Sequence, residues 1–193
     1  MTLENTNFTG HLLIAMPNLT DPYFAKSVTF ICAHNQEGAM GIVVNRPTDM
    51  TYGALFEKIN FNLQNQALAA RPVLYGGPVQ PERGFVLHQH IGDWDSSITV
   101  ADDIALTTSK DILNAVAEGN GPEKLLLSLG YAGWTAGQLE QEISQNAWLS
   151  VKPKDKETLH KVLFDTPHED QLNAAMSLLG IDPSMLSDIA GHA

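Results

Sequence analysis

Residues 127–151 read LSLGYAGWTAGQLEQEISQNAWLSV and contain the features that decide the fold. The stretch begins within Lys124 to Gly130, a run that is apolar at both alternating sets of positions, as in a strand covered on both faces. Gly130 and Gly133 then interrupt the apolar pattern, and a segment with helical spacing follows. The order strand, glycine-containing loop and helix is one in which many α/β proteins bind a ligand.

The start of the predicted helix also supports a purely structural interpretation. Thr135 and Gln138 match a capping box, in which the threonine oxygen accepts a backbone N–H and the glutamine reaches back. Trp134 and Leu139 occupy the positions of a hydrophobic staple. Neither motif explains why Tyr131 stands between two glycines.

Outward from this stretch, hairpins alternate with separate helices. Residues 28–34 and 40–46 flank a glycine-containing loop at 35–39 and predict a hairpin. The other expected strands span residues 11–16, 73–75, 84–90, 97–100, 105–107 and 148–151. The expected helices span residues 51–59, 110–118, 158–165 and 168–179, with a loop or weak helix at 64–71. This order, without repeats or linkers, indicates one α+β domain over residues 1–193 with a mixed sheet.

The composition excludes several classes of partner. The chain has 193 residues, of which 44% are hydrophobic and 17% charged, so a sizeable core is expected. Its net charge is −11, and its densest basic run, Lys152 to Lys156, is broken by Asp155. Because clustered lysines and arginines are what bind a phosphate backbone, we expect neither nucleic acid nor an anionic membrane surface as a direct partner.

The predicted location is the cytoplasm. Residues 1–7 have neither the basic start nor the apolar segment of a signal peptide. No apolar run approaches the roughly 20 residues that cross a bilayer. A single cysteine, Cys32, excludes an internal disulfide and fits a reducing compartment.

Metal and nucleophile patterns are incomplete. Cys32 with His34, and His88 with His90, each place two donors on one side of a strand, but the spacing typical of zinc sites is missing. No G-x-S-x-G elbow occurs, and Cys32 in an apolar strand is expected to be an inert core residue. We therefore expect no metal, no cofactor and no assembled catalytic set.

An anion site is the chemical alternative. Gly130 and Gly133 precede a predicted helix start, and Gly76 and Gly77 form a second glycine-rich turn upstream of Arg83. Each turn alone is explained by a need for positive φ. If the two turns meet in space, Arg83 beside a helix N-terminus would suit an anion.

Several segments together resemble one bacterial family, the AlgH/YqgE proteins. They are Cys32 to Asn35, Gly38 to Asn45, Gly76 to Pro78, Arg83 to His88, Ser128 to Trp134, Gly137 to Glu140, Glu142 with Ile143, and Asn146 to Trp148, with His11 to Pro17 and Ala190 to Ala193 at the two ends. The resemblance covers nearly the whole chain and implies a one-domain fold with a bent, bifurcated sheet that curls toward a barrel and is flanked by helices. It implies no settled activity, although some members carry the label of transcriptional regulator.

The sequence thus favours a cytosolic binding or regulatory protein without catalysis. The alternative is an enzyme acting on a small anionic, phosphorylated ligand, and a DNA-binding regulator is least favoured because of the charge. The partner is expected to be a protein or a small anionic ligand. The side chains and backbone groups predicted to form one binding surface are those of His34, Asn45, Gly76, Gly77, Arg83, His88, Gly130, Tyr131, Gly133, Trp134 and Glu140.

Overall fold

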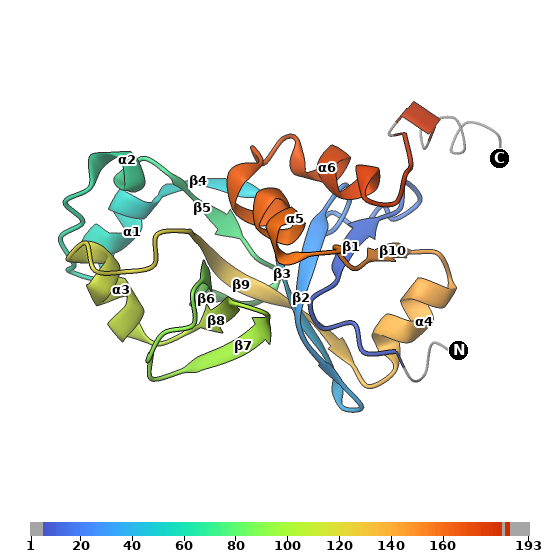
Figure 1. Cartoon of the computed structure of the whole chain (residues 1–193), viewed down its shortest axis with the longest axis horizontal. Coiled ribbons are helices and arrows are strands. Elements are labelled where there is room, and N and C mark those ends of the chain that lie inside the picture. The colour runs from blue at the N-terminus through green and yellow to red at the C-terminus, as the bar shows by residue number, and fades with distance from the viewer. Residues whose placement is uncertain (1–5, 183, 186–193) are drawn as a thin grey trace.

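Ten strands and their surrounding helices are built from residues 6–182, 184 and 185, the part of the chain that the computed structural model describes (Figure 1). The resemblance noted at Ala190 to Ala193 lies outside these residues. The strands are β1 (Leu12–Ala15), β2 (Val28–Asn35), β3 (Gly38–Val43), β4 (Pro47–Thr51), β5 (Pro72–Tyr75), β6 (Val79–Gln89), β7 (Ser97–Ala101), β8 (Ile104–Thr107), β9 (Leu125–Thr135) and β10 (Trp148–Val151). The helices are α1 (Tyr52–Lys58), α2 (Gln66–Ala69), α3 (Lys110–Ala117), α4 (Gln138–Ser144), α5 (Lys156–His160) with the π-helical turn η2 (Lys161–Asp165), and α6 (Gln171–Ser177).

The sheet is mixed and branches along β9. Its main path has the strand order β10-β1-β2-β3-β9-β6-β8-β7. On one side of β9, the first half pairs in parallel with β5, where Leu74 lies opposite Ser128, and the second half pairs antiparallel with β3, where Met40 lies opposite Gly133. β6 runs along the other side, and β4 pairs with β5. The predicted α+β fold with a bent, bifurcated sheet is confirmed.

Glycines at the branch point let backbones meet with no side chain between them. A Cβ atom on Gly76 would lie 2.3 Å from the carbonyl oxygen of Gly130, and one on Gly77 would lie 2.1 Å from the carbonyl carbon of Tyr131. Gly130 has φ +74° in the left-handed region, which suits glycine. The Gly76 N–H donates to the carbonyl of Leu129 at 2.9 Å. The two glycine-rich segments therefore do meet in space, as closely packed backbone.

An inner cluster of apolar side chains lies on one face of the curled sheet. Leu12 and Phe30 reach it from β1 and β2, and Leu87 reaches it from β6. Leu163 of η2 and Met176 of α6 cover it from the helical side, which Figure 1 shows above the strands. Because neighbouring residues of a strand point to opposite faces, each of these strands also contributes to an outer cluster.

Two outer clusters cover the opposite face of the sheet. Tyr52 and Phe56 of α1 and Ile112 of α3 pack against Leu127 of β9 at one end. The other outer cluster, at the α4 end, contains the members Leu13, Ile31, Trp134, Leu139 and Trp148.

The prediction of a loop at residues 130–133 is wrong, and so is the prediction that Thr135 caps the helix that follows. Residues 130–135 continue β9, because β3 provides a hydrogen-bonding partner that the local sequence does not reveal. Helix α4 begins later, at Gln138, after the left-handed Gly137. Half of the predicted capping box forms, since the Thr135 N–H donates to Gln138 Oε1 at 2.9 Å, but the threonine hydroxyl does not cap the helix.

Other boundaries also differ from the prediction. The hairpin of β2 and β3 forms, but its pairing extends to Asn35 opposite Gly38, so the loop is shorter than residues 35–39. A register shift between Ile31 and Ala33 marks a bulge at Cys32. The last predicted helix begins at Gln171 rather than at residue 168.

Candidate functional site

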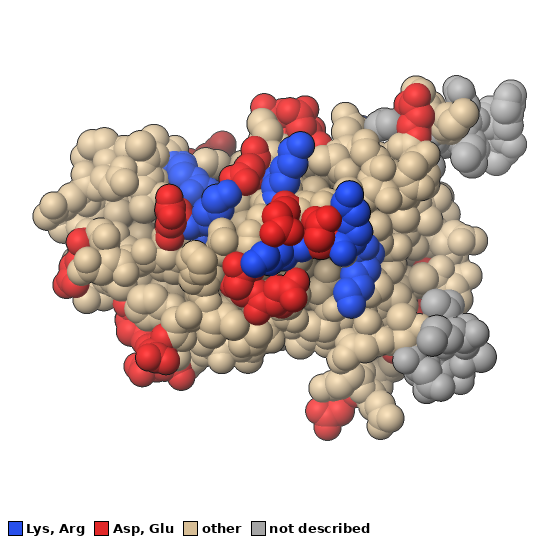
Figure 2. Space-filling model, viewed as in Figure 1, with Lys and Arg blue, Asp and Glu red and all other residues tan. Residues whose placement is uncertain are grey.

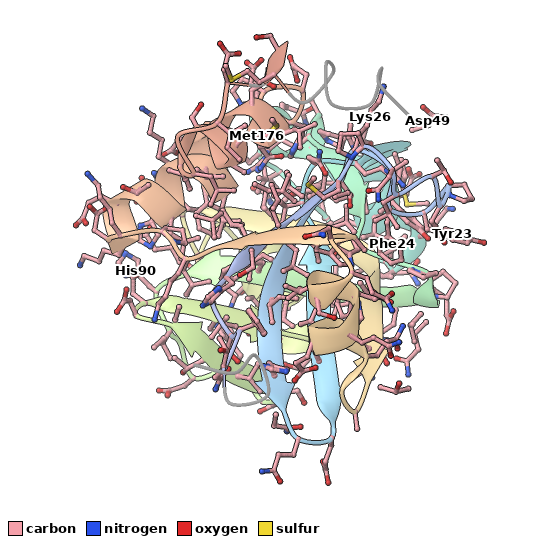
Figure 3. The ribbon with its side chains drawn as sticks, turned by 90° about the vertical axis from the view of Figure 1, so that its right-hand side faces the viewer. Tyr23, Phe24, Lys26, Asp49, His90 and Met176 are labelled. Atoms are coloured by element: carbon pink, nitrogen blue, oxygen red, sulfur yellow. The ribbon has the colours of Figure 1, made fainter. Side chains whose placement is uncertain are left out.

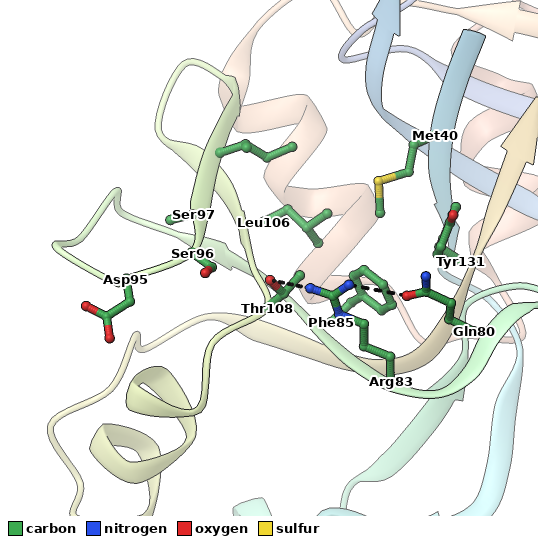
Figure 4. Close-up of a pocket in the computed structure, with 11 residues that line it drawn as sticks. Met40, Gln80, Arg83, Phe85, Asp95, Ser96, Ser97, Leu106, Thr108 and Tyr131 are labelled. Carbon is green, nitrogen blue, oxygen red and sulfur yellow. Dashed lines mark hydrogen bonds between the residues drawn. The ribbon is translucent and has the colours of Figure 1, made fainter.

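A cavity of about 440 Å³ lies among residues of β3, β6, β7, β8 and β9 and of the adjoining loops (Figure 4). We call it the Tyr131 cavity. Its lining residues are Met40, Gln80, Arg83, Phe85, Asp95, Ser96, Ser97, Ile98, Leu106, Thr108 and Tyr131. Phe85 and Leu106 belong to the inner cluster, and Met40 and Tyr131 pack against it. The cavity is therefore a continuation of the concave face of the sheet, in the position where curled β-sheets often hold a ligand.

An irregular pairing in β6 brings a cation to the cavity. Val79 lies opposite Tyr131 of β9, yet the next pair joins Gly84 to Leu129, so the four residues 80–83 of β6 face only Gly130 of β9. Arg83 is the last residue of this bulge, and its guanidinium lies 5.7 Å from the centre of the Phe85 ring.

The contacts of the Arg83 guanidinium are all uncharged. Its Nη1 and Nη2 atoms donate to Gln80 Oε1 and Thr108 Oγ1, each at 3.3 Å. Among residues 6–182, 184 and 185, Arg83 forms no ion pair. The Arg83 guanidinium therefore carries a positive charge that is not ion-paired within the described part of the chain.

Tyr131 separates this cavity from a second hollow. Its ring packs edge-on against Phe85, with 5.5 Å between the ring centres. The second hollow, of about 560 Å³, is more open and is lined by Tyr131 and Met40 together with Gly133, Trp134 and residues of the β2–β3 hairpin. Tyr131, which stands between two glycines in the sequence, thus lies between two concave surfaces.

His88 lies behind the cavity wall at the start of a hydrogen-bond relay. It is fully buried, and burial lowers its pKa below the ordinary value, which favours the neutral ring. Its Nδ1 lies 3.0 Å from the carbonyl oxygen of His90, which can only accept, so Nδ1 carries the ring proton. Nε2, 2.8 Å from Thr107 Oγ1, must then accept from that hydroxyl. Thr107 Oγ1 in turn lies 2.9 Å from Ser97 Oγ, on the face of β7 and β8 opposite to Ile98 and Leu106, which line the cavity.

His34, Glu140 and Asn45 lie outside both sets of lining residues and join parts of the fold. The Phe8 N–H donates to His34 Nδ1 at 3.0 Å, so His34 Nε2 carries the ring proton and donates to Glu140 Oε1 at 2.8 Å. Asn45 accepts from the Val28 N–H at 2.9 Å through Oδ1. These hydrogen bonds tie β2 to the N-terminal segment, to α4 and to the end of β3.

Comparison with known proteins identifies the family to which this chain belongs. The family described as AlgH-like matches residues 12–184 of the sequence. The chain belongs to the AlgH-like family. A UPF0301 protein of Azoarcus sp. (strain BH72) is 52% identical over 193 residues, which are 100% of both chains. A UPF0301 protein of Thiobacillus denitrificans is 54% identical over 191 residues, covering 99% of this chain and 100% of the relative.

Solved structures agree with the AlgH-like assignment. The solution structure of the AlgH protein from Pseudomonas aeruginosa has a TM-score of 0.78 and 45% identity, covering 98% of this chain and 97% of that one. A Corynebacterium diphtheriae protein has a TM-score of 0.67 at 21% identity, a likeness of fold alone, covering 89% of this chain and 87% of the other. In this AlgH-like chain, none of the helices within the described residues combines the length and the apolarity needed to cross a membrane.

The tryptophans of the AlgH-like motifs are held by one carboxylate. The indole N–H groups of Trp134 and Trp148 both donate to Glu142 Oε2, at 2.9 and 2.8 Å, and Gln138 Nε2 donates to Glu142 Oε1 at 2.9 Å. Phe24 packs against both rings, with 6.3 and 5.6 Å between ring centres. Figure 3 shows Phe24 nearer to the centre of the molecule than its neighbour Tyr23. Trp134 is thus mainly a core residue that also borders the second hollow.

Cys32 and the histidines do not combine into a metal or nucleophile site. Cys32 is buried in the inner cluster, and burial raises the pKa of its thiol. His34 is engaged by Phe8 and Glu140 as described above. Within the described part of the chain, no group of three or more His, Cys, Asp or Glu side chains could hold a metal ion.

Sequence reasoning missed most of the cavity wall. Of the eleven predicted residues, Arg83 and Tyr131 line the Tyr131 cavity, and Gly133 and Trp134 line the second hollow. Phe85 and Met40 stood in the family motifs but were not singled out. Ser97 and Thr108 gave no local signal, because their positions depend on how β7 and β8 pair.

Proposed function

We propose that this AlgH-like protein is a cytoplasmic, non-catalytic binding protein whose Tyr131 cavity takes up a small, partly apolar anion. The guanidinium of Arg83, which forms no ion pair with any described residue, lies at the edge of a largely apolar cavity and carries this proposal. The cavity volume of about 440 Å³ is in the range of small-ligand sites. Arginine suits carboxylate and phosphate groups because its planar fork can donate two parallel hydrogen bonds.

Two further features favour binding over catalysis and a small ligand over nucleic acid. The hydroxyl of Ser97 and the ring of His88 are joined through Thr107 on the sheet face opposite to Ile98 and Leu106, so neither group reaches a ligand in the cavity. On the face drawn in Figure 2, lysines and arginines alternate with aspartates and glutamates instead of forming a continuous basic stripe. Such a mixed surface gives little attraction for a phosphate backbone.

Binding of anilinonaphthalene sulfonate, an apolar anion that fluoresces when it leaves water, tests the proposal. We expect saturable binding to the folded protein, weakened about tenfold by Arg83→Gln because one charge-assisted contact is lost. Ile98→Trp should also weaken binding, since Ile98 lines the cavity and is 45% exposed, so that a larger ring can occupy the space without disturbing the core.

The matched control removes a cation elsewhere. Lys154 lines a different hollow, and its side chain is 84% exposed. Lys154→Gln should therefore leave the dye affinity unchanged. Loss of binding in Lys154→Gln, with normal binding in Arg83→Gln and Ile98→Trp, would refute the assignment of the site.

A further inference from the structure

The bulge at residues 80–83 groups hydrogen-bond donors at one end of the Tyr131 cavity. Gln80 has φ +47°, a left-handed conformation that is strained for a side chain other than glycine and that recurs at ligand-binding sites. Gln80 Oε1 and Thr108 Oγ1 both accept from Arg83, as the dashed lines in Figure 4 show. The amide hydrogens of Gln80 and the hydroxyl proton of Thr108 have no acceptor among the described residues. Three side chains thus offer donors to an anion here.

The charge of this end favours an anion with a single negative charge. Arg83 is the one lysine or arginine among the described residues that line the cavity. Its neighbour Glu82 is exposed, and the whole chain has a net charge of −11. A phosphate monoester carries close to two negative charges at neutral pH, of which one guanidinium balances only part. A carboxylate carries one charge and matches the planar fork of arginine.

The second hollow continues the concave face of the sheet beyond Tyr131. Ala33 lies opposite Met40, and Met40 lies opposite Gly133, so these residues form one row across β2, β3 and β9. Residues that lie directly opposite each other point to the same face of a sheet. The small residues on either side of Met40 leave the floor of the hollow low, and the unbranched methionine side chain adapts to an apolar neighbour.

Gly133 keeps this floor open although the backbone does not require a glycine there. A Cβ atom on Gly133 would lie 3.3 Å from Tyr131 Cε2 and 3.7 Å from Val79 Cγ2, which are both side-chain atoms. Its φ also lies outside the left-handed region, unlike that of Gly77 or Gly130. Glycine inside a strand weakens the strand and often marks a place that a ligand approaches closely. Its absent side chain leaves the ring edge of Tyr131 bordering the hollow.

We propose that the Tyr131 cavity and the second hollow together form one groove for a fatty acid, with one carboxylate and an unbranched acyl chain. The carboxylate binds Arg83, and the chain lies along the apolar wall of the cavity and passes Tyr131 to reach Gly133. The two spaces, of about 440 and 560 Å³, meet at Met40 and Tyr131, which border both. This inference rests on the proposed function, because it names the class of ligand for the same cavity.

Probes with one chain and three head groups test the carboxylate end. Decanoate, decanamide and decyl phosphate are compared by their displacement of anilinonaphthalene sulfonate. We expect decanoate to bind about tenfold more tightly than decanamide, because the amide lacks the charge-assisted contact, and more tightly than decyl phosphate. Arg83→Gln should remove most of the preference for decanoate over decanamide. Equal affinities of the wild type for decanoate and decanamide, or a preference for decyl phosphate, would overturn the proposal.

Probes of different length test the path past Tyr131. Decanoate has four more CH₂ groups than hexanoate, and each buried CH₂ raises affinity by up to about fourfold, so decanoate should bind at least about tenfold more tightly. Gly133→Val raises the floor of the second hollow and should reduce this ratio about threefold or more. Ala33→Leu, on the other side of Met40, should have the same effect. Ala136→Val is the matched control, because Ala136 is exposed and lines neither space.

The outcomes distinguish this inference from the proposed function. Thermal melting identifies the variants that are folded, and the ratio is compared among those. If the dye binds in an Arg83-dependent manner but the ratio in Gly133→Val and Ala33→Leu equals that in Ala136→Val, the chain does not enter the second hollow. The fatty acid groove is then excluded and the binding function stands. If the dye itself does not bind, both proposals are wrong.

Discussion

Glu142 offers the sharpest test of what holds the AlgH-like motifs together. Its carboxylate accepts three hydrogen bonds, two from Trp134 and Trp148 and one from Gln138. The two indole rings are 7% and 2% exposed, so neither N–H group has easy access to water. In Glu142→Ala, both indoles lose their acceptor at a cost of about 1–3 kcal/mol each.

The expected loss of stability is therefore large for one side chain. Two unsatisfied indoles, together with the lost contact to Gln138, give about 3–5 kcal/mol for Glu142→Ala. For a chain of this size, that corresponds to a melting temperature lower by roughly 6–20 °C. Glu142→Gln should cost less, about 1–2 kcal/mol, because its amide oxygen still accepts from the indoles while its NH₂ group faces the NH₂ group of Gln138.

Thermal and urea unfolding followed by tryptophan fluorescence measures both variants. Glu169→Ala is the matched control, since Glu169 is an exposed glutamate in a loop between η2 and α6. The control should melt within about 2 °C of the wild type, because exposed substitutions usually change stability by less than about 0.5 kcal/mol. A Glu142→Ala variant as stable as the Glu169→Ala control would show that the carboxylate does not hold the two tryptophans.

Two further predictions concern the branch point and the buried histidine. Gly77→Ala should destabilise the fold by about 3 kcal/mol or more, because its Cβ would meet the backbone of Tyr131 at 2.1 Å. Gly84→Ala is the control, because a Cβ at that position meets nothing within 4 Å. Equal urea midpoints for the two variants would refute the argument. Because burial lowers the pKa of His88 in the folded chain, the unfolded chain takes up a proton at a higher pH than the folded chain. The contribution of His88 to the free energy of unfolding is therefore complete above the pKa of the unfolded state and is lost as the pH falls below that pKa. Between about pH 7.5 and about pH 5.5, the stability of the wild type should therefore fall more steeply than that of His88→Gln, and parallel pH profiles would contradict this.

The spacing of apolar residues and the helix caps were sufficient to predict several strands and helices. The apolar run before Gly130 is a strand in the centre of the sheet, and β9 is indeed covered by clusters on both faces. The expected helix at residues 51–59 forms as α1, with Thr51 accepting from the Ala54 N–H at its start. These outcomes depend on side-chain spacing and capping, which are properties of contiguous residues.

Such patterns could not predict which strands pair when the strands lie far apart in the sequence. Residues 130–135 resemble a loop because they contain two glycines, yet pairing with β3 makes them a strand. The position of Arg83 follows from a mismatch in length between β6 and β9, which neither segment reveals alone. Ser97 joins the hydrogen-bonded chain of Thr107 and His88 only because β7 pairs with β8, which brings Ser97 opposite Thr107.

The glycines of the motifs link the fold to the cavity. Because Gly76 and Gly77 allow β5 to leave β9 at Gly130, the second half of β9 is free to pair with β3, and Met40 is brought to the same space as Tyr131. The change of partner coincides with the extra residues of β6 that position Arg83 over Phe85. One set of glycines therefore fixes both the branching of the sheet and the composition of the cavity wall. A ligand in the Tyr131 cavity would contact segments that meet only when the branch point is intact, so binding should raise the melting temperature of the whole domain.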